Sequence, residues 1–312
     1  MNPAFSLVAF TTLSGLGFGM MAWLGFGLGA HSAAFAWLSV ITAYAAALGG
    51  LLMSTRHLLR PDRAKYALSQ WRTSWLSREG VLAIATLGVF GLYAIPWLLF
   101  GVRIGVLGIA STALAGATVY ATGMIYRSLE TVPRWATPLT PACFVAFALA
   151  SGALSDAMLT DLTARDDGGR ADGAAIFLLL IAFALKWAWW ERAKKTDLAS
   201  AGATPEAATG LEGLGTVRQL EAPHTGKTWL LKEMAFTVGR KRATALKRVA
   251  VGLGLVVPVI CVDLSGRFGA IFVPIGLASH LAGLMAERWL FFAEAEHAVT
   301  AYYASEEAQA AE

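Results

Sequence analysis

The sequence predicts an all-α, polytopic membrane protein, a bundle of eight transmembrane helices. Two observations carry this prediction. Of the 312 residues, 56% are hydrophobic and only 15% are charged, whereas a soluble domain usually carries about 25% charged residues. The mean hydropathy is accordingly high, at +0.57. The apolar residues are also grouped in long runs, which excludes the alternating apolar and polar pattern of a transmembrane β-barrel strand.

Eight runs are long enough to cross a bilayer, because a hydrocarbon core of roughly 30 Å needs about 20 apolar residues in a helix. They lie at about 5–29, 33–53, 80–101, 104–124, 138–158, 173–190, 249–265 and 269–292. The first run is too long for a cleaved signal peptide and has no basic segment before it. It contains Gly-x-x-x-Gly pairs, Gly15 with Gly19 and Gly25 with Gly29, which predict close packing against a neighbouring helix.

The distribution of positive charge predicts the orientation. Nineteen of the 25 Lys and Arg residues lie in the connections between the second and third, fourth and fifth, and sixth and seventh runs, and four lie in the opposite connections. The positive-inside rule places the basic connections in the cytoplasm. We therefore expect a multi-pass protein of a bacterial inner membrane, with both termini and the large loops cytoplasmic.

Composition divides the chain into four parts. Residues 1–195 hold the first six transmembrane helices, 196–248 form a cytoplasmic linker and partner-docking loop, 249–295 hold the last two helices, and 296–312 are a tail. Within the loop, residues 196–215 are rich in Gly, Ala and Thr, which predicts a flexible linker. Residues 216–234 contain two β-capable runs around a Pro-His-Thr-Gly turn, which predicts a hairpin that docks on another subunit.

Cysteine and nucleotide motifs exclude several classes of site. Cys143 and Cys261 lie in separate predicted helices without a Cys-x-x-Cys partner, so we expect no iron–sulfur cluster or zinc site in this chain. The stretch HTGKT at 224–228 resembles the end of a phosphate-binding loop, but Glu221 occupies the place of the required glycine. We therefore expect neither a bound nucleotide nor a nucleic-acid partner.

Histidines are the possible haem ligands. Only His280 is placed deep in a predicted helix, and His57 and His297 lie near membrane borders. A lone histidine inside a membrane is more often a hydrogen-bonded packing residue than a ligand, so we expect no haem. The spacing alone leaves the pair of His57 with His280 open.

Three charged residues lie at membrane depth, where an unpaired charge costs a few kcal/mol or more. Lys186 could extend its ammonium group to the interface. Glu287 and Arg288 could pair with groups on other helices, or they could form a functional site. The sequence leaves both interpretations open.

The connection at residues 54–80, STRHLLRPDRAKYALSQWRTSWLSREG, contains one His, one Glu and six basic residues. His57 follows the second predicted helix and Glu79 precedes the third, so both lie on the same side of the membrane. A histidine can donate a hydrogen bond to a quinone carbonyl, and a carboxylate can accept a proton from a quinol. The alternative interpretation is a capped loop with solvated charges, and spacing alone favours it.

Five segments resemble the membrane anchor subunit of the dimethyl sulfoxide reductase family. They are NPAFSLVAFTTLSGLG, HLLRPDRAKYALSQWRTSWLSRE, MIYRSLETVPRWATPLTP, TWLLKEMAFTVGRK and ERWLFFAEAEH, and together they span nearly the whole chain except residues 196–215. The resemblance implies an eight-helix anchor that has no redox centre of its own and catalyses nothing alone. It implies two partners, a molybdopterin catalytic subunit and a four-cluster, ferredoxin-like iron–sulfur subunit. It also implies electron exchange with a quinone, either menaquinone or ubiquinone.

The resemblance also implies which residues form the quinone site. His57 matches the family's His-Leu-x-x-Pro-x-Arg-Ala pattern, although Leu59 stands where a glycine is usual, and Glu79 matches the acidic residue that follows. The segment with Thr131, Pro133 and Trp135 implies a rigid turn at the same membrane face. The full predicted quinone site is His57, Glu79, Arg56, Arg60, Arg63, Arg72, Trp71 and Trp75, with Glu287 and Arg288 as the second candidate.

The direction of electron flow stays open at this point. A sulfoxide reductase would oxidise quinol, whereas a sulfite-oxidising relative would reduce quinone. A transporter is the rival from another class, and it should show inverted repeats and helices broken by Gly or Pro. No internal repeat is visible, although Pro96, Pro258 and Pro274 keep that alternative open.

Overall fold

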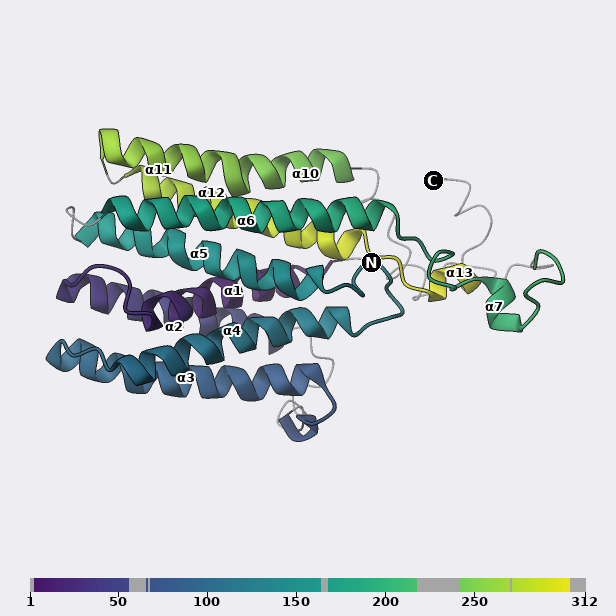
Figure 1. The fold of residues 1–312 in the computed structure, drawn as a ribbon, viewed down its shortest axis with the longest axis horizontal. Helices are drawn as coiled ribbons and strands as arrows, with labels where there is room; N and C mark the ends of the chain where they lie inside the picture. The colour runs from purple at the N-terminus through teal and green to yellow at the C-terminus, as the bar shows by residue number, and fades with distance from the viewer. Residues whose placement is uncertain are drawn as a thin grey trace.

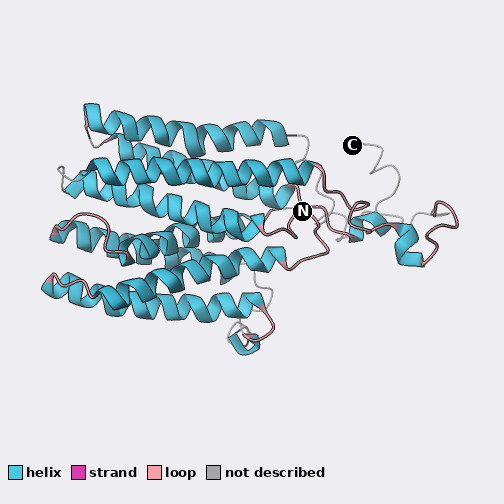
Figure 2. Ribbon diagram, in the orientation of Figure 1, coloured by secondary structure: helices cyan, strands magenta, loops and turns pink. Residues whose placement is uncertain are grey.

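The computed structural model is a bundle of long helices that run side by side (Figure 1). It describes residues 3–55, 66, 68–163, 168–217, 242–269 and 271–303. Within these ranges every regular element is a helix and no strand occurs (Figure 2). The predicted all-α fold class is therefore confirmed.

The bundle has eight members in chain order. They are α1 (Phe5–Gly25), α2 (Ala33–Thr55), α3 (Trp75–Phe100), α4 (Gly105–Arg127), α5 (Leu139–Thr163), α6 (Gly168–Lys194), the continuous run of α10 (Ala243–Val251), η2 (Gly252–Val256) and α11 (Val257–Phe268), and α12 (Phe272–Ala293). Among the described residues, seven helices are long and apolar enough to cross a membrane. The eighth, α12, has 22 residues, carries His280, Glu287 and Arg288, and packs against α1, α5, α10 and α11.

All the connections that are rich in Lys and Arg leave from one end of the bundle. At this end α2, α4 and α6 finish and α3, α5 and α10 begin, and the N-terminus lies there too (Figure 1). The short helices α7 (Pro205–Thr209) and α13 (Val299–Tyr303) extend beyond the same end. We call it the basic end. The arrangement agrees with the alternation of charge along the sequence.

Helices α1 and α5 form the centre, and small residues let them approach each other. A side chain at Gly19 would collide with the backbone of Ala148 in α5, and one at Gly25 with Gly108 in α4, so close packing is confirmed at these positions. Helix α1 is shorter than predicted. It ends at Gly25, because Gly27 turns the chain with a φ of 77°.

Helix α3 begins five residues before the predicted start, at Trp75 instead of Gly80. Ser74 caps it, since the Ser74 hydroxyl accepts a hydrogen bond from the Ser77 N–H at 3.4 Å. Glu79 was expected in the connection before the helix. It instead lies inside α3, where it faces the interior of the bundle.

A missing helical hydrogen bond explains why a histidine lies deep in the bundle. Pro258 has no N–H, so it cannot donate to the carbonyl of Gly254, its partner in a regular α-helix. The Gly254 carbonyl is instead bonded by His280 Nδ1 of α12, at 2.7 Å. Because a carbonyl only accepts, Nδ1 carries the imidazole proton, and Nε2 accepts from the Ser151 hydroxyl at 2.9 Å. His280 is therefore a hydrogen-bonded packing residue.

The preceding residues form the π-helical turn η2. The Val257 N–H bonds to the Gly252 carbonyl, which leaves the Leu253 carbonyl without a helical partner. The Ser279 hydroxyl of α12 donates to it at 2.8 Å. Two neighbouring side chains of α12 thus donate hydrogen bonds to the two carbonyls that lack helical partners. The seventh member stays a continuous helix, whereas the transporter alternative requires a broken one.

Two predictions for the large loop have different outcomes. The linker at 196–215 contains the short helix α7, which Thr204 caps by accepting from the Ala207 N–H at 3.2 Å. The predicted hairpin at 216–234 lies outside the described residues, except for its first two positions. The C-terminal tail lies outside them from residue 304 onward.

Candidate functional site

Glu79 is a buried carboxylate near the basic end of the bundle. Its exposed fraction is 5%, and it lies where α3 packs on α4. The Thr122 hydroxyl of α4 is hydrogen-bonded to Glu79 Oε1 at 2.5 Å. Among the described residues no Lys or Arg forms an ion pair with it. Because burying an unpaired carboxylate is costly, Glu79 is a candidate for proton exchange rather than a packing residue.

The Thr122 hydroxyl can serve Glu79 in both protonation states. It has one proton and two possible acceptors, Glu79 Oε1 at 2.5 Å and the Thr118 carbonyl at 3.1 Å. When Glu79 is ionised, Thr122 donates to the carboxylate. When Glu79 is protonated, Glu79 donates to the Thr122 oxygen and Thr122 donates to the Thr118 carbonyl. The pair can therefore gain or lose a proton without moving a heavy atom.

The segment just before α3 is folded back on the start of that helix. Arg78 donates to the Trp71 carbonyl at 3.0 Å and to the Arg72 carbonyl at 2.6 Å. Its guanidinium lies 4.4 Å from the centre of the Trp75 ring, and Trp75 contacts Tyr120 of α4 edge to face. Trp71 and Arg72 are exposed, whereas Trp75 lies one turn before Glu79 on the same helix face. The structure thus brings Trp75 and Glu79 to the α3–α4 interface.

His57 lies outside the described residues, as do Arg56, Arg60 and Arg63. The described residues show only where the connection that contains these four residues leaves α2 and where it enters α3. Thr55 closes α2 and Trp75 opens α3 at the basic end, the end at which Glu79 is buried. That His57 approaches Glu79 stays a prediction.

The second candidate, Glu287 with Arg288, belongs to a buried charge cluster. Lys186 Nζ of α6 lies 2.5 Å from Glu287 Oε1, and Arg288 Nε lies 3.5 Å from Glu287 Oε2. All three side chains are at most 2% exposed, so Lys186 does not extend to the interface. Its ammonium group lies 3.8 Å from the centre of the Trp189 ring. Two cations and one anion leave the cluster with one excess positive charge.

Aromatic rings separate this charge cluster from the basic end. Tyr126 stacks on Phe144 at 5.4 Å between ring centres and meets Phe291 and Phe292 edge to face. Phe144 also faces the Arg288 guanidinium at 3.8 Å. The rings lower the local dielectric, which strengthens the interactions among the charges behind them.

The turn at 131–135 is tied to the end of α12. The Trp135 indole N–H donates to the Phe291 carbonyl at 3.1 Å, and the two rings stack with 5.2 Å between centres. The Ala298 N–H donates to the Thr131 carbonyl at 2.8 Å. Arg134 donates to the Glu294 carbonyl at 2.9 Å. The turn is therefore held by backbone and side-chain bonds at the basic end.

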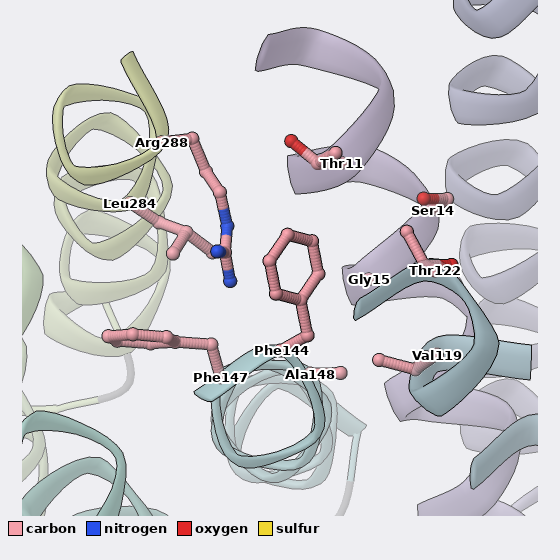
Figure 3. Close-up of a pocket in the computed structure, with 10 residues that line it drawn as sticks. All are labelled: Thr11, Ser14, Gly15, Val119, Thr122, Phe144, Phe147, Ala148, Leu284 and Arg288. Atoms are coloured by element: carbon pink, nitrogen blue, oxygen red, sulfur yellow. The ribbon is translucent and has the colours of Figure 1, made fainter. Parts of the chain in front are cut away.

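A small cavity lies between Thr122 and Arg288 (Figure 3). Its volume is about 10 Å³, close to the roughly 10–15 Å³ that one bound water needs. A quinone ring is far too large for it. The lining residues come from α1, α4, α5 and α12 and are Thr11, Ser14, Gly15, Val119, Thr122, Phe144, Phe147, Ala148, Leu284 and Arg288.

Sequence reasoning missed Thr122 entirely. It lies 43 residues from Glu79, and a single threonine in an apolar helix carries no motif. The one signal available was that a carboxylate inside a helix bundle needs a partner.

In the part of the chain that the structure describes, no group of three His, Cys, Asp or Glu side chains is arranged to hold a metal ion.

Comparison with known proteins points to one family. The sequence model described as DMSO reductase anchor subunit (DmsC) matches residues 1–190. The chain is 29% identical over 327 aligned positions to a subunit of the sulfite dehydrogenase of Allochromatium vinosum, and the alignment covers 98% of this chain and 99% of the relative. No solved structure matches the chain. The family match includes both Glu79 and Thr122.

Proposed function

Because the chain belongs to the DMSO reductase anchor subunit (DmsC) family and is the membrane anchor subunit of such an oxidoreductase complex, we propose that it exchanges electrons with quinone beside Glu79. The single observation that carries this proposal is the buried carboxylate held by Thr122. Converting quinone to quinol moves two protons with two electrons, so a group that binds a proton at the membrane border is needed. Glu79 is such a group.

The chain's own residues divide this work. Glu79 holds or accepts a proton, and the Thr122 hydroxyl forms a hydrogen bond with its carboxyl group in either protonation state. His57 donates a hydrogen bond to the quinone oxygen. The α4 side of Glu79 is filled by Thr122, beyond which the cavity has room only for a water, so the quinone ring approaches from the side of the connection at 56–74. Trp71 and Trp75 flank that entry at the level of the lipid headgroups.

The basic end faces the cytoplasm of a bacterial cell, in this proposal, because it carries most of the Lys and Arg. An iron–sulfur subunit binds there and a molybdopterin subunit binds to it in turn. The helices α7 and α13 extend beyond this end and lie in the path of any such partner (Figure 1). Because the relative that aligns over the whole chain is called a sulfite dehydrogenase subunit, we propose that the complex oxidises sulfite and reduces quinone.

The test compares two electron acceptors in the intact complex. In His57→Ala and Glu79→Gln, sulfite-dependent reduction of a quinone analogue should fall about a hundredfold to ten-thousandfold, the usual cost of losing a general acid or base. Reduction of a soluble dye that takes electrons from the iron–sulfur partner should not change. Glu191→Gln is the matched control, since Glu191 is an exposed carboxylate of α6 near the same end.

Three results would refute the proposal. Equal loss with quinone and dye, or release of the partner subunits, would make the region a docking surface. Unchanged quinone reduction in both variants would remove His57 and Glu79 from the site. A complex that oxidises quinol with dimethyl sulfoxide and ignores sulfite would reverse the proposed direction.

A further inference from the structure

A groove on the surface of the bundle lies between α4 and α6, with α5 as its floor. Both α4 and α6 pack on α5 (Figure 1), and residues of all three helices line the groove. Its volume is about 430 Å³, within the roughly 300–1,000 Å³ of sites that bind small molecules. Apart from Arg127 and the Tyr120 hydroxyl, the lining side chains are apolar. The groove is therefore suited to an apolar chain.

The groove occupies one half of the bundle. Along α5 its lining runs from Pro141, at the basic end, to Leu149, near the middle of the helix. A helix rises about 12 Å between these two positions, close to half of the roughly 30 Å hydrocarbon core of a bilayer. Tyr120 and Ile181 on the two walls are exposed, so the groove is open to the surrounding lipid. It has the length of an acyl chain in the leaflet at the basic end.

A cation stands at the mouth of the groove on the α4 side. Arg127 belongs to the last turn of α4 and lines the groove. Among the described residues its guanidinium has a long hydrogen bond to the Met124 sulfur at 3.7 Å, and no carboxylate forms an ion pair with it. A basic residue at this level of a membrane attracts anionic lipid headgroups.

A second cation stands near the mouth on the α6 side. Arg192 lies on the same helix face as Leu185, a lining residue, and two turns closer to the basic end. It donates to the Ala136 carbonyl at 3.4 Å, two residues before Pro138, which also lines the groove. Arg192 Nη1 is buried and has no hydrogen-bond partner among the described residues. Because a buried donor without an acceptor is costly, this atom points to an acceptor from outside the chain.

We propose that the groove binds one acyl chain of an anionic phospholipid, whose phosphate lies between the guanidinium groups of Arg127 and Arg192. Phosphate oxygens accept the paired N–H groups of arginine, and two cations favour an anionic headgroup over a zwitterionic one. The neighbouring carboxylate of Glu191 does not take the place of the phosphate, because it is paired with Lys194 at 2.6 Å. The bound lipid joins α4 to α6 across the surface of α5.

The isoprenoid tail of a quinone is the rival occupant. Tyr120 lines the groove and also contacts Trp75, which lies one turn before Glu79. The charges at the mouth favour the phospholipid, since a quinone carries no phosphate for Arg127 and Arg192. The proposed lipid site does not depend on quinone chemistry, so it can be tested on the chain without its partners.

The test titrates the delipidated full-length chain with phosphatidylglycerol or with phosphatidylethanolamine of the same acyl chains, and native mass spectrometry measures the bound lipid. Phosphatidylglycerol should bind more tightly. Arg127→Gln and Arg192→Gln should each weaken its binding about fivefold, the effect of one basic residue near an anionic headgroup, and the double variant should bind both lipids alike. Lys195→Gln is the matched control, because Lys195 is an exposed cation at the same end of α6 that does not line the groove.

A second pair of variants tests the groove itself. Ala142→Phe places a ring on the floor of the groove and should weaken the binding of both lipids, whereas Ala45→Phe, on the exposed face of α2, should not. Circular dichroism checks that each variant is folded, and Arg127→Gln alone decides the headgroup question if Arg192→Gln does not fold. Equal affinity of the original chain for the two lipids overturns the inference, as does phosphatidylglycerol binding that survives Arg127→Gln or Ala142→Phe unchanged. Loss of a bound quinone in Ala142→Phe, with lipid binding intact, would assign the groove to the quinone tail instead.

Discussion

Replacing His280 tests whether its side chain takes the place of the hydrogen bond that Pro258 removes from the seventh member of the bundle. His280 is fully buried and its Nδ1 donates to the Gly254 carbonyl, which lost its helical donor to Pro258. In His280→Leu a side chain of comparable size fills the space, so the main loss is the unpaired carbonyl. Ser151 can then turn its single hydroxyl proton from the histidine to the Phe147 carbonyl, which lies 2.8 Å away.

The magnitude follows from that one carbonyl. A buried polar group left without a partner costs about 1–3 kcal/mol, whereas side-chain hydrogen bonds between membrane helices average about 0.6 kcal/mol and reach about 1.7. We expect His280→Leu to lower the free energy of unfolding by about 2 kcal/mol. Pro258→Ala restores an N–H that can reach Gly254. In that background, His280→Leu should cost less than about 1 kcal/mol.

The assay is equilibrium unfolding of the four proteins in mixed micelles with sodium dodecyl sulfate, followed by far-ultraviolet circular dichroism. Coupling of about 1 kcal/mol or more between the two substitutions supports the reasoning. Additive costs would refute it, because His280 would then not be replacing the bond that Pro258 removes. A neutral His280→Leu would refute it as well.

Four further predictions concern topology, cofactor content and packing. On intact cells, a single cysteine introduced at Ser200 should not react with a membrane-impermeant thiol reagent, whereas one introduced at Asp167 should react. The two native cysteines are buried and give little background. Labelling at Ser200 would mean that the orientation is the reverse of the one proposed. The purified chain should show no haem absorption, since both ring nitrogens of the deep histidine are hydrogen-bonded, and a stoichiometric Soret band would contradict this. Gly19→Ala should disrupt the bundle, because the added methyl group would collide with α5. Gly49→Ala places its methyl group in open space and should raise the free energy of unfolding by about 0.5–1 kcal/mol. Thermal unfolding of the two variants measures both effects. Glu287→Gln should lower the free energy of unfolding by about 3–5 kcal/mol, because it leaves the buried cations unpaired. A decrease below about 1 kcal/mol, measured by unfolding in micelles, would show that water reaches the charge cluster.

Composition and periodicity were sufficient to predict the helices, but they placed some helix ends wrongly. A hydrophobic run loses its signal at charged residues, so the third helix was expected to begin after Arg78 and Glu79. The helix instead begins at Trp75, because Ser74 caps it and the bundle buries Glu79. Local rules act within a few residues, and they cannot foresee that a carboxylate will find a hydroxyl on another helix.

The candidate site was therefore predictable only in part. The resemblance to a family pointed to Glu79, and the cost of charge in a membrane pointed to Glu287 and Arg288. Their partners Thr122 and Lys186 belong to helices far away in the sequence. The cavity between Thr122 and Arg288 depends on how four helices pack, and no sequence pattern encodes its size.

The buried charged side chains of α12 have a consequence for membrane insertion. This helix follows the other seven members of the bundle in the chain, and it carries His280, Glu287 and Arg288. A basic residue near the centre of an inserting helix costs about 2.5–3.5 kcal/mol at the translocon, and Lys186 of α6 carries the matching charge for Glu287. Helix α12 is thus best accepted by the bilayer when α6 is already in place beside it. A chain truncated before α12 would leave Lys186 in the bilayer without its carboxylate partner.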